Sequence, residues 1–170
     1  FENYKITWTT GVNTLFNALL NERWFTDSPP KHLKASAAGG MSLHESVAKR
    51  WRDVTGTPIV EGYGLTESSP VLSFNPLGGM FKDNSIGIPV PSTEMACVDE
   101  NGKEVAIGEP GELIARGPQI MKGYWNRDEE TKNTLKDGWL YTGDIAQMDS
   151  DGYFTIVDRK KDMVIVSGFN

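Results

Sequence analysis

The sequence predicts a mixed α/β fold, in which part of a helix-covered sheet is followed by a small antiparallel β unit. Up to Pro76, segments with apolar residues at helical spacing alternate with short apolar runs of strand length. Beyond Pro76 the helical spacing disappears, glycines become frequent, and polar turn sequences separate the apolar runs. The first pattern is typical of parallel β-α-β units, and the second is typical of antiparallel strands.

Two helices and two strands are predicted in the first half. Residues 11–21 form the first helix, since apolar residues recur there at helical spacing: Val12, Leu15, Phe16 and Leu19. The second helix begins at a capping-box pattern of Ser42 with Glu45. Its inner face carries Leu43, Val47, Trp51 and Val54. Residues 33–38 and 58–61 are short and apolar, so they are predicted as strands that end at a Gly39-Gly40 turn and a Gly62-Tyr63-Gly64 turn.

The second half is predicted to be a small antiparallel unit, in the form of a distorted barrel. Strands are predicted at 94–98, 112–116, 153–157 and 163–166, with polar turns at 99–102, 141–144 and 149–152. One helix is predicted at 127–135, because the acidic residues at its start suit a helix N-terminus. Tyr124 and Trp125 are interpreted as core aromatics.

Composition excludes several classes of protein. With 170 residues the chain can form one domain or two packed subdomains, and 38% hydrophobic content with 24% charged content indicates a globular chain. The net charge of −6 argues against a nucleic-acid partner. Cys97 lies in an apolar stretch and is predicted to be an inert core residue; as the only cysteine it suits a reducing, cytoplasmic setting. Two histidines and one cysteine cannot form a zinc site of the usual kind.

The segment EGYGLTE, residues 61–67, carries the groups that phosphoryl chemistry needs. It follows a predicted strand, and open α/β sheets bind ligands beyond the carboxyl ends of their strands. Thr66 can donate to a phosphate oxygen, and Glu67 can hold Mg²⁺ together with substrate phosphates. Tyr63 offers a flat face to a base. A glycine-rich turn followed by a helix cap explains the same residues, and on this segment alone the two interpretations are even.

Three other segments have both a structural and a functional interpretation. Gly39 and Gly40 fit a strand-to-helix turn. Asp144 in YTGD fits a turn, although one carboxylate can also accept hydrogen bonds from both hydroxyls of a ribose. The charge run at 158–162 fits a solvated face.

Taken in order, GYGLTE, TGD and DRKKD resemble the adenylate-forming ligases, and specifically the AMP-forming acyl-CoA synthetases of the bacterial long-chain fatty acid type. The resemblance implies that Thr66 and Glu67 are the candidate catalytic residues, with Thr66 on the phosphate and Glu67 on Mg²⁺. It places Asp144 and Arg159 at the ribose and Lys161 at the hinge between two domains. The implied adenine contacts are Gly39, Gly40, Met41, Glu61, Gly62, Tyr63 and Gly64.

The resemblance implies a fragment of a long-chain fatty acid–CoA ligase that uses ATP, Mg²⁺ and coenzyme A, passing through acyl-AMP. Residues 1–80 would belong to the α/β subdomain of a large N-terminal domain, 81–157 to an antiparallel β subdomain, and 158–170 to the hinge and the start of a C-terminal domain. The family's phosphate loop and C-terminal lysine would lie outside the chain, which alone is expected to be inactive. Association of the whole protein with the inner face of a membrane, its oligomeric state and its chain-length preference stay open.

Two other functions stay open. One is another adenylate-forming ligase, of the aryl-CoA or luciferase type, and the other is a non-catalytic nucleotide-binding module.

Overall fold

The structure is a computed structural model that describes residues 4–40 and 43–159. The chain divides into two compact units, which are described in turn. The first contains the described residues up to Gly62 together with Asn75–Asn84, and the second contains Tyr63–Phe74 and the described residues from Ser85 onward. The chain therefore passes between the units more than once. The domain limits proposed from the sequence, near residues 80 and 157, remain predictions.

Parallel strands form the sheet of the first unit. β1 (Trp8–Gly11) pairs with β2 (Ala35–Ala38), and β2 pairs with the start of β3 (Ile59–Gly64), both in parallel register. All four residues of β2 are buried, and the strand has a neighbour on each side. The predicted β-α-β arrangement is confirmed. β1 was not predicted, since the sequence WTTG has no apolar alternation.

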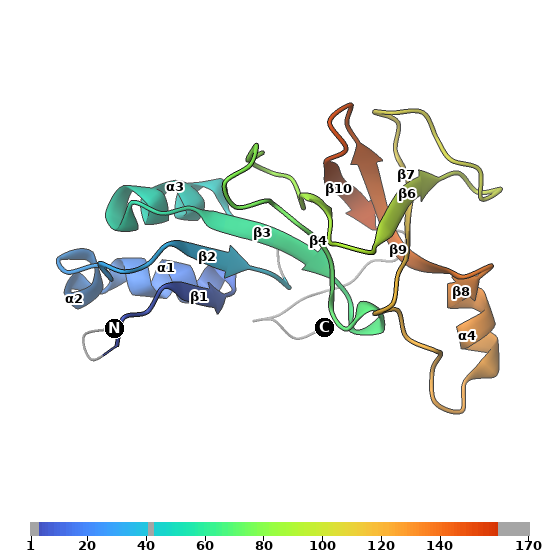
Figure 1. The fold of residues 1–170 in the computed structure, drawn as a ribbon, viewed down its shortest axis with the longest axis horizontal. Coiled ribbons are helices and arrows are strands. Elements are labelled where there is room, and N and C mark those ends of the chain that lie inside the picture. Colours follow the sequence, from blue (N-terminus) through green and yellow to red (C-terminus); the bar gives the residue numbers. More distant parts are fainter. Residues whose placement is uncertain (1–3, 41–42, 160–170) are drawn as a thin grey trace. The chain divides into compact units, whose positions relative to one another are not determined.

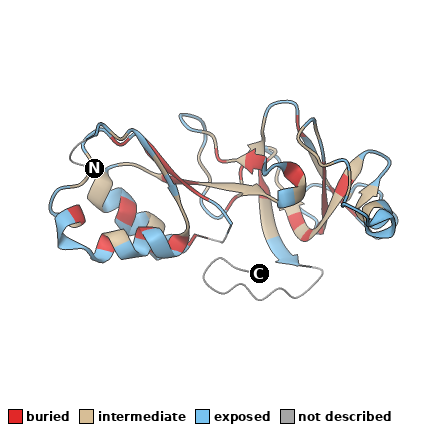
Figure 2. Cartoon of the chain, turned by 90° about the horizontal axis from the view of Figure 1, so that it is seen from below, coloured by how far each residue is buried: buried red, intermediate tan, exposed pale blue. Residues whose placement is uncertain are grey.

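Three helices cover one face of these strands (Figures 1 and 2): α1 (Asn13–Asn21), α2 (Arg23–Thr26) and α3 (Glu45–Thr55). Each contributes a fully buried aromatic residue to the core, and the three rings touch. The Trp51 ring centroid lies 4.9 Å from that of Phe16, edge to face, and 5.1 Å from that of Phe25, stacked. Aromatic pairs at these distances add to the free energy gained from burial alone, so this cluster holds the helices together.

Both predicted helices of the first half are present, with differences at their ends and faces. In α1, Leu20 is buried whereas the predicted inner residue Leu15 is 44% exposed, because the helix turns Phe16 and Leu20 toward α3. The N-cap of α3 is His44, so the predicted start at the Ser42 capping box is wrong; Ser42 itself lies outside the described residues. α3 ends at Gly56, whose φ of +71° favours glycine.

Antiparallel strands form the second unit. β10 (Phe154–Arg159), β9 (Trp139–Met148), β7 (Gly111–Arg116) and β6 (Glu94–Val98) follow one another across a sheet, and β8 (Leu135–Lys136) pairs with β9. β4 (Val71–Phe74) pairs with β5 (Ile88–Pro89), next to a bridge between Gly87 and Phe154. These strands make a curled, half-closed barrel around Cys97, Leu113, Ala146 and Phe154, which confirms the predicted antiparallel unit.

Several predicted elements of this unit are confirmed. The strands at 94–98 and 112–116 correspond to β6 and β7, and the helix at 127–135 corresponds to α4 (Asp128–Thr134), with three acidic residues in its first turn. Cys97 is buried as predicted, and burial raises the pKa of its thiol to about 11. The predicted strand at 163–166 and the hinge residue Lys161 lie outside the described residues.

Candidate functional site: the nucleotide motifs

The segment predicted as a Gly62-Tyr63-Gly64 turn is part of strand β3, so that prediction is wrong. The chain reverses after Gly64, where Leu65 N donates to the Pro70 carbonyl oxygen at 2.9 Å. A Cβ on Gly64 would lie 1.8 Å from that same oxygen. Glycine is therefore required at position 64 by the close approach of two backbone segments rather than by an unusual φ.

The short 3₁₀ helix η1 (Thr66–Ser68) presents the candidate catalytic residues. Ser68 is fully buried and accepts a hydrogen bond from Leu65 N at 2.9 Å, and its hydroxyl also contacts the Pro70 carbonyl. Thr66 is exposed at the start of this turn, and Glu67 is half-buried. Ser68 was missed by the sequence analysis, although a serine three residues after Leu65 is typical of a turn-stabilising side chain.

Glu67 is bound by a segment that the sequence analysis assigned to the core. Tyr124 Oη donates to Glu67 Oε1 at 2.7 Å, and Met121 N donates to the Glu67 carbonyl oxygen at 2.8 Å. Burial raises the pKa of the Tyr124 hydroxyl, and its hydrogen bond to the carboxylate raises it further. Tyr124 is 36% exposed and Trp125 is 90% exposed, so the prediction that both are core aromatics is wrong. The loop before α4 faces solvent instead.

Asp144 lies inside strand β9 and not in the predicted tight turn. The register between β7 and β9 shifts around it, since Glu112 pairs with Ile145 whereas Ile114 pairs with Tyr141. Gly143 occupies this bulge with a φ of +77°, where glycine is favoured. The Thr142 hydroxyl accepts a hydrogen bond from Asp144 N at 3.1 Å and donates to the Leu113 carbonyl at 2.7 Å. The bulge therefore fixes the direction of the Asp144 side chain.

Two other predicted site residues contact the carboxylate of Asp144, a residue that is 4% exposed. Tyr63 Oη donates to Oδ2 at 2.5 Å, and Arg159 Nε lies 3.0 Å from Oδ1. Arg159 is the residue of β10 that pairs directly with Asp144, so the strand register brings the two together. Burial, followed by the charge of Asp144, raises the pKa of Tyr63 far above its usual range, which keeps the phenol a donor. Both carboxylate oxygens are thus engaged by protein groups.

Of the remaining predicted adenine residues, those that the structure describes lie just after β2 and within β3, in the first unit. Ala38 pairs with Glu61, and a Cβ on Gly39 would lie 3.8 Å from the Gly62 carbonyl oxygen, so the glycine pair lies beside this part of β3. Gly40 has a φ of +77°, which confirms the predicted turn. Met41 lies outside the described residues.

Glu61 contributes both its backbone and its side chain to this region. Its carbonyl oxygen accepts a hydrogen bond from Asn75 N at 3.0 Å, and its carboxylate accepts one from Leu43 N at 3.3 Å. Burial raises the pKa of the Glu61 carboxyl, the hydrogen bond from Leu43 lowers it, and the charge of Asp83 raises it. Glu61 thus connects β3 to the segment that follows the Gly39-Gly40 turn.

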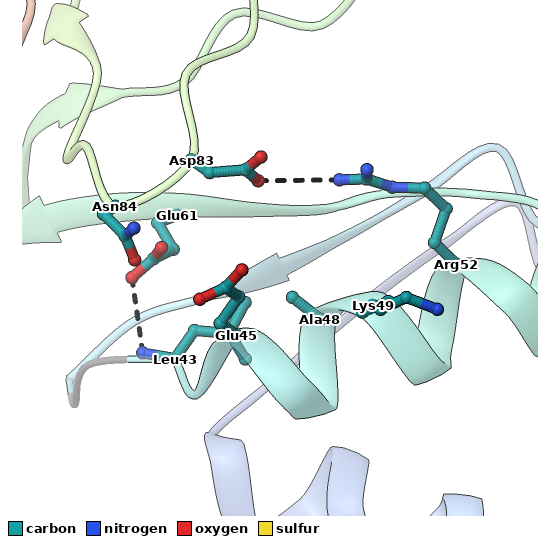
Figure 3. A pocket seen from close by; sticks show the side chains of 8 residues that line it. All are labelled: Leu43, Glu45, Ala48, Lys49, Arg52, Glu61, Asp83 and Asn84. Carbon is teal, nitrogen blue, oxygen red and sulfur yellow. Dashed lines mark hydrogen bonds and ion pairs between the residues drawn. The ribbon is translucent and has the colours of Figure 1, made fainter.

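The Glu61 carboxylate also lines a pocket of about 240 Å³ beside α3. Figure 3 shows its side chains, among which Arg52 and Asp83 form an ion pair at 3.6 Å. The lining residues are Leu43, Glu45, Ala48, Lys49, Arg52, Glu61, Asp83 and Asn84. Neither Gly39 nor Gly40 is among them.

Glu67 suits a Mg²⁺ ion by its donor chemistry, because hard cations prefer carboxylate oxygens and Mg²⁺ commonly binds one carboxylate together with substrate phosphates. Within residues 4–40 and 43–159, no group of three or more histidine, cysteine, aspartate or glutamate side chains is arranged to hold a metal by itself. In the same part of the chain, no helix is both long and apolar enough to cross a bilayer.

Comparison with known proteins identifies relatives that align with nearly the whole chain. A long-chain-fatty-acid–CoA ligase of Salmonella typhimurium is 56% identical over 167 residues, and one of Yersinia pestis is 54% identical over 167 residues. Both alignments cover 98% of this chain, which spans 30% of the length of each relative. Among solved structures, an anthranilate CoA ligase in complex with anthranoyl-AMP superposes with a TM-score of 0.86 at 30% identity, over 98% of this chain and 32% of that one.

A family model described as "AMP-binding enzyme" matches residues 1–125, which is well over half of the sequence. The resemblance inferred from GYGLTE, TGD and DRKKD is thereby confirmed, and the chain belongs to the family of AMP-binding enzymes.

Proposed function

We propose that this chain is the nucleotide-binding part of a long-chain fatty acid–CoA ligase, which converts a fatty acid and ATP to acyl-AMP and pyrophosphate and then forms acyl-CoA. The observation that carries the proposal is the identity of 54–56% to ligases of that name across nearly all of the chain. The meeting of Tyr63, Asp144 and Arg159 supports it further.

In this proposal, each part of the nucleotide has its own residues. Asp144 and Arg159 recognise the ribose, and Tyr63 presents its ring to the adenine from the same cluster. The Glu61 and Gly62 backbone and the glycine pair at positions 39 and 40, with Met41, complete the adenine contacts. Ribose hydroxyls would replace the Tyr63 hydroxyl at Asp144 Oδ2, so nucleotide binding would release the Tyr63 phenol.

The phosphate end is assigned to η1. Thr66 is exposed there and can donate to a phosphate oxygen, while the Glu67 carboxylate would hold Mg²⁺. When bound, the metal would neutralise charge on the phosphates. The fatty acid carboxylate would attack the α-phosphorus in line and displace pyrophosphate. The thiolate of coenzyme A would then attack the acyl carbonyl and displace AMP. Lys161 would be the hinge residue about which the C-terminal domain turns between these two half-reactions.

The experiment is pyrophosphate exchange into ATP by the full-length protein, with a long-chain fatty acid, benzoate and a hydroxycinnamate as competing acids. Fatty acid–dependent exchange that falls by about 10²- to 10³-fold in Glu67→Gln is expected, as for loss of a charge-stabilising group. Exchange with an aromatic acid alone would replace the proposal by an aryl-CoA ligase, a candidate favoured by the similarity to the anthranilate enzyme. AMP binding without any exchange would indicate a non-catalytic module.

The cytoplasmic setting and a peripheral association with the membrane are also proposals. Fractionation of cells that express the tagged full-length protein tests both.

A further inference from the structure

The loop before α4 contacts Glu67 at two points, one on its backbone and one on its side chain. Met121 N donates to the carbonyl oxygen of Glu67, and Tyr124 Oη donates to its carboxylate. We propose that Tyr124 is a positioning residue that holds the Glu67 carboxylate in the orientation that receives Mg²⁺. This inference rests on the metal-binding role of Glu67 that is proposed above.

The two contacts fix both the backbone of Glu67 and the carboxylate at the end of its side chain. The Met121 bond, at 2.8 Å, sets the backbone of η1, and the Tyr124 bond, at 2.7 Å, sets the end of the side chain. Glu67 has three rotatable side-chain bonds, which cost rotamer entropy when they are ordered. Tyr124 engages Oε1, and no described residue donates a hydrogen bond to Oε2. The second oxygen therefore stays available for a cation while the first is held.

Helix α4 in turn fixes the position of Tyr124. Thr131 Oγ1 accepts a hydrogen bond from Tyr124 N at 2.9 Å and donates to the Arg127 carbonyl at 2.8 Å. Gly123 allows this contact, since its φ is +149° and a Cβ there would lie 2.8 Å from Thr131 Cγ2. α4 buries none of its residues, so core packing does not explain its place in the unit. Through Thr131, α4 holds the backbone of Tyr124 in place.

Partners that orient a metal ligand have a measurable effect on the metal. Removal of such a partner typically weakens metal affinity or activity by about 10- to 100-fold, because the ligand loses its fixed orientation. Tyr124 is partly exposed, so we expect the lower end of that range. The effect should be confined to metal-dependent binding, since Tyr124 has no assigned contact with adenine or ribose.

The test is a calorimetric titration of ATP into the full-length protein at a series of Mg²⁺ concentrations, beside AMP without metal. Tyr124→Phe keeps the ring and removes the hydroxyl. It should raise the half-saturating Mg²⁺ concentration about 10-fold and leave AMP affinity and the unfolding midpoint unchanged. Tyr4→Phe, the same change at a tyrosine that is 76% exposed, is the matched control. Thr131→Val should shift the Mg²⁺ dependence in the same direction as Tyr124→Phe.

Comparison with Glu67→Gln separates the two proposals. If Glu67→Gln weakens Mg²⁺-dependent binding and Tyr124→Phe does not, the role of Tyr124 is refuted while that of Glu67 stands. If Glu67→Gln has no effect, the metal role of Glu67 itself fails. If both variants weaken binding, the double variant should be no worse than Glu67→Gln alone, because the hydroxyl acts only through that carboxylate. Additive effects would contradict the proposal.

Discussion

Replacing Asp144 with alanine should destabilise the second unit, and the size of the effect can be worked from its two contacts. The bond from Tyr63 ends on a buried carboxylate, and hydrogen bonds to charged groups contribute about 1.5–3 kcal/mol. The Arg159 side chain is 38% exposed, so its ion pair is screened by water and contributes less than about 1 kcal/mol. Removing the carboxylate also removes the cost of burying its charge, which offsets part of this contribution. The net loss in the free energy of unfolding is therefore about 2 kcal/mol.

A loss of this size is measurable by calorimetry. For a chain of this length it lowers the melting temperature by roughly 4–8 °C, at about 2–4 °C per kcal/mol. Tyr63→Phe should reproduce most of the loss, and the double variant should add little to it, because both changes delete the same hydrogen bond. Melting of Asp144→Ala at the wild-type temperature would show that the cluster contributes nothing and would refute the reasoning.

The same variants distinguish stability from nucleotide recognition. Asp144→Ala removes the proposed acceptor for ribose, so its apparent KM for ATP should rise by at least about 10-fold, as when hydrogen bonds to a charged group are lost. Tyr63→Phe removes the competing donor but keeps the ring and the carboxylate, so AMP affinity should not fall in this variant, in contrast to Asp144→Ala. An unchanged KM in Asp144→Ala would contradict the ribose assignment, whatever happens to the melting temperature.

Two further predictions concern Gly64 and Cys97. Gly64→Ala should cost about 3 kcal/mol or more in denaturant unfolding, because its Cβ meets the Pro70 backbone at 1.8 Å. Gly108→Ala is the control, because a Cβ there would meet no atom within 4 Å although the φ is +87°. This variant should cost only about 1–2 kcal/mol in unfolding free energy. Equal costs for the two variants would refute the argument from close approach. Burial raises the pKa of Cys97 from 9.0 to about 11, so its contribution to stability is present below pH 9 and is lost as pH rises toward 11. Cys97→Ala should lose less stability than the wild type over that interval, as measured by denaturant titration at each pH; parallel curves would contradict the assignment.

Local periodicity predicted most of the elements, because it reflects burial that is decided within a few residues. The inner face of α3 and the strands β6 and β7 are examples. The glycines at Gly62–Gly64 and at Gly143 predicted turns, whereas both segments lie in strands. Glycine is needed at position 64 because another backbone segment approaches it closely. It is needed at position 143 because the bulge there requires a positive φ. A turn, a close approach and a bulge all favour glycine, so the residue alone does not distinguish them.

The contacts that define the candidate site join residues that are distant in the sequence. Tyr63 and Asp144 are 81 residues apart, and Glu67 and Tyr124 are 57 residues apart. Motif resemblance supplied Tyr63, Glu67 and Asp144 one by one, but no local pattern pairs them with their partners. Tyr124 was assigned to a core because aromatic residues are usually buried there, yet its position follows from a hydroxyl that reaches a carboxylate and from a helix that holds it there. The residues proposed to contact the ligand could thus be named from their motifs, whereas the residue proposed to orient one of them could be found only from the fold.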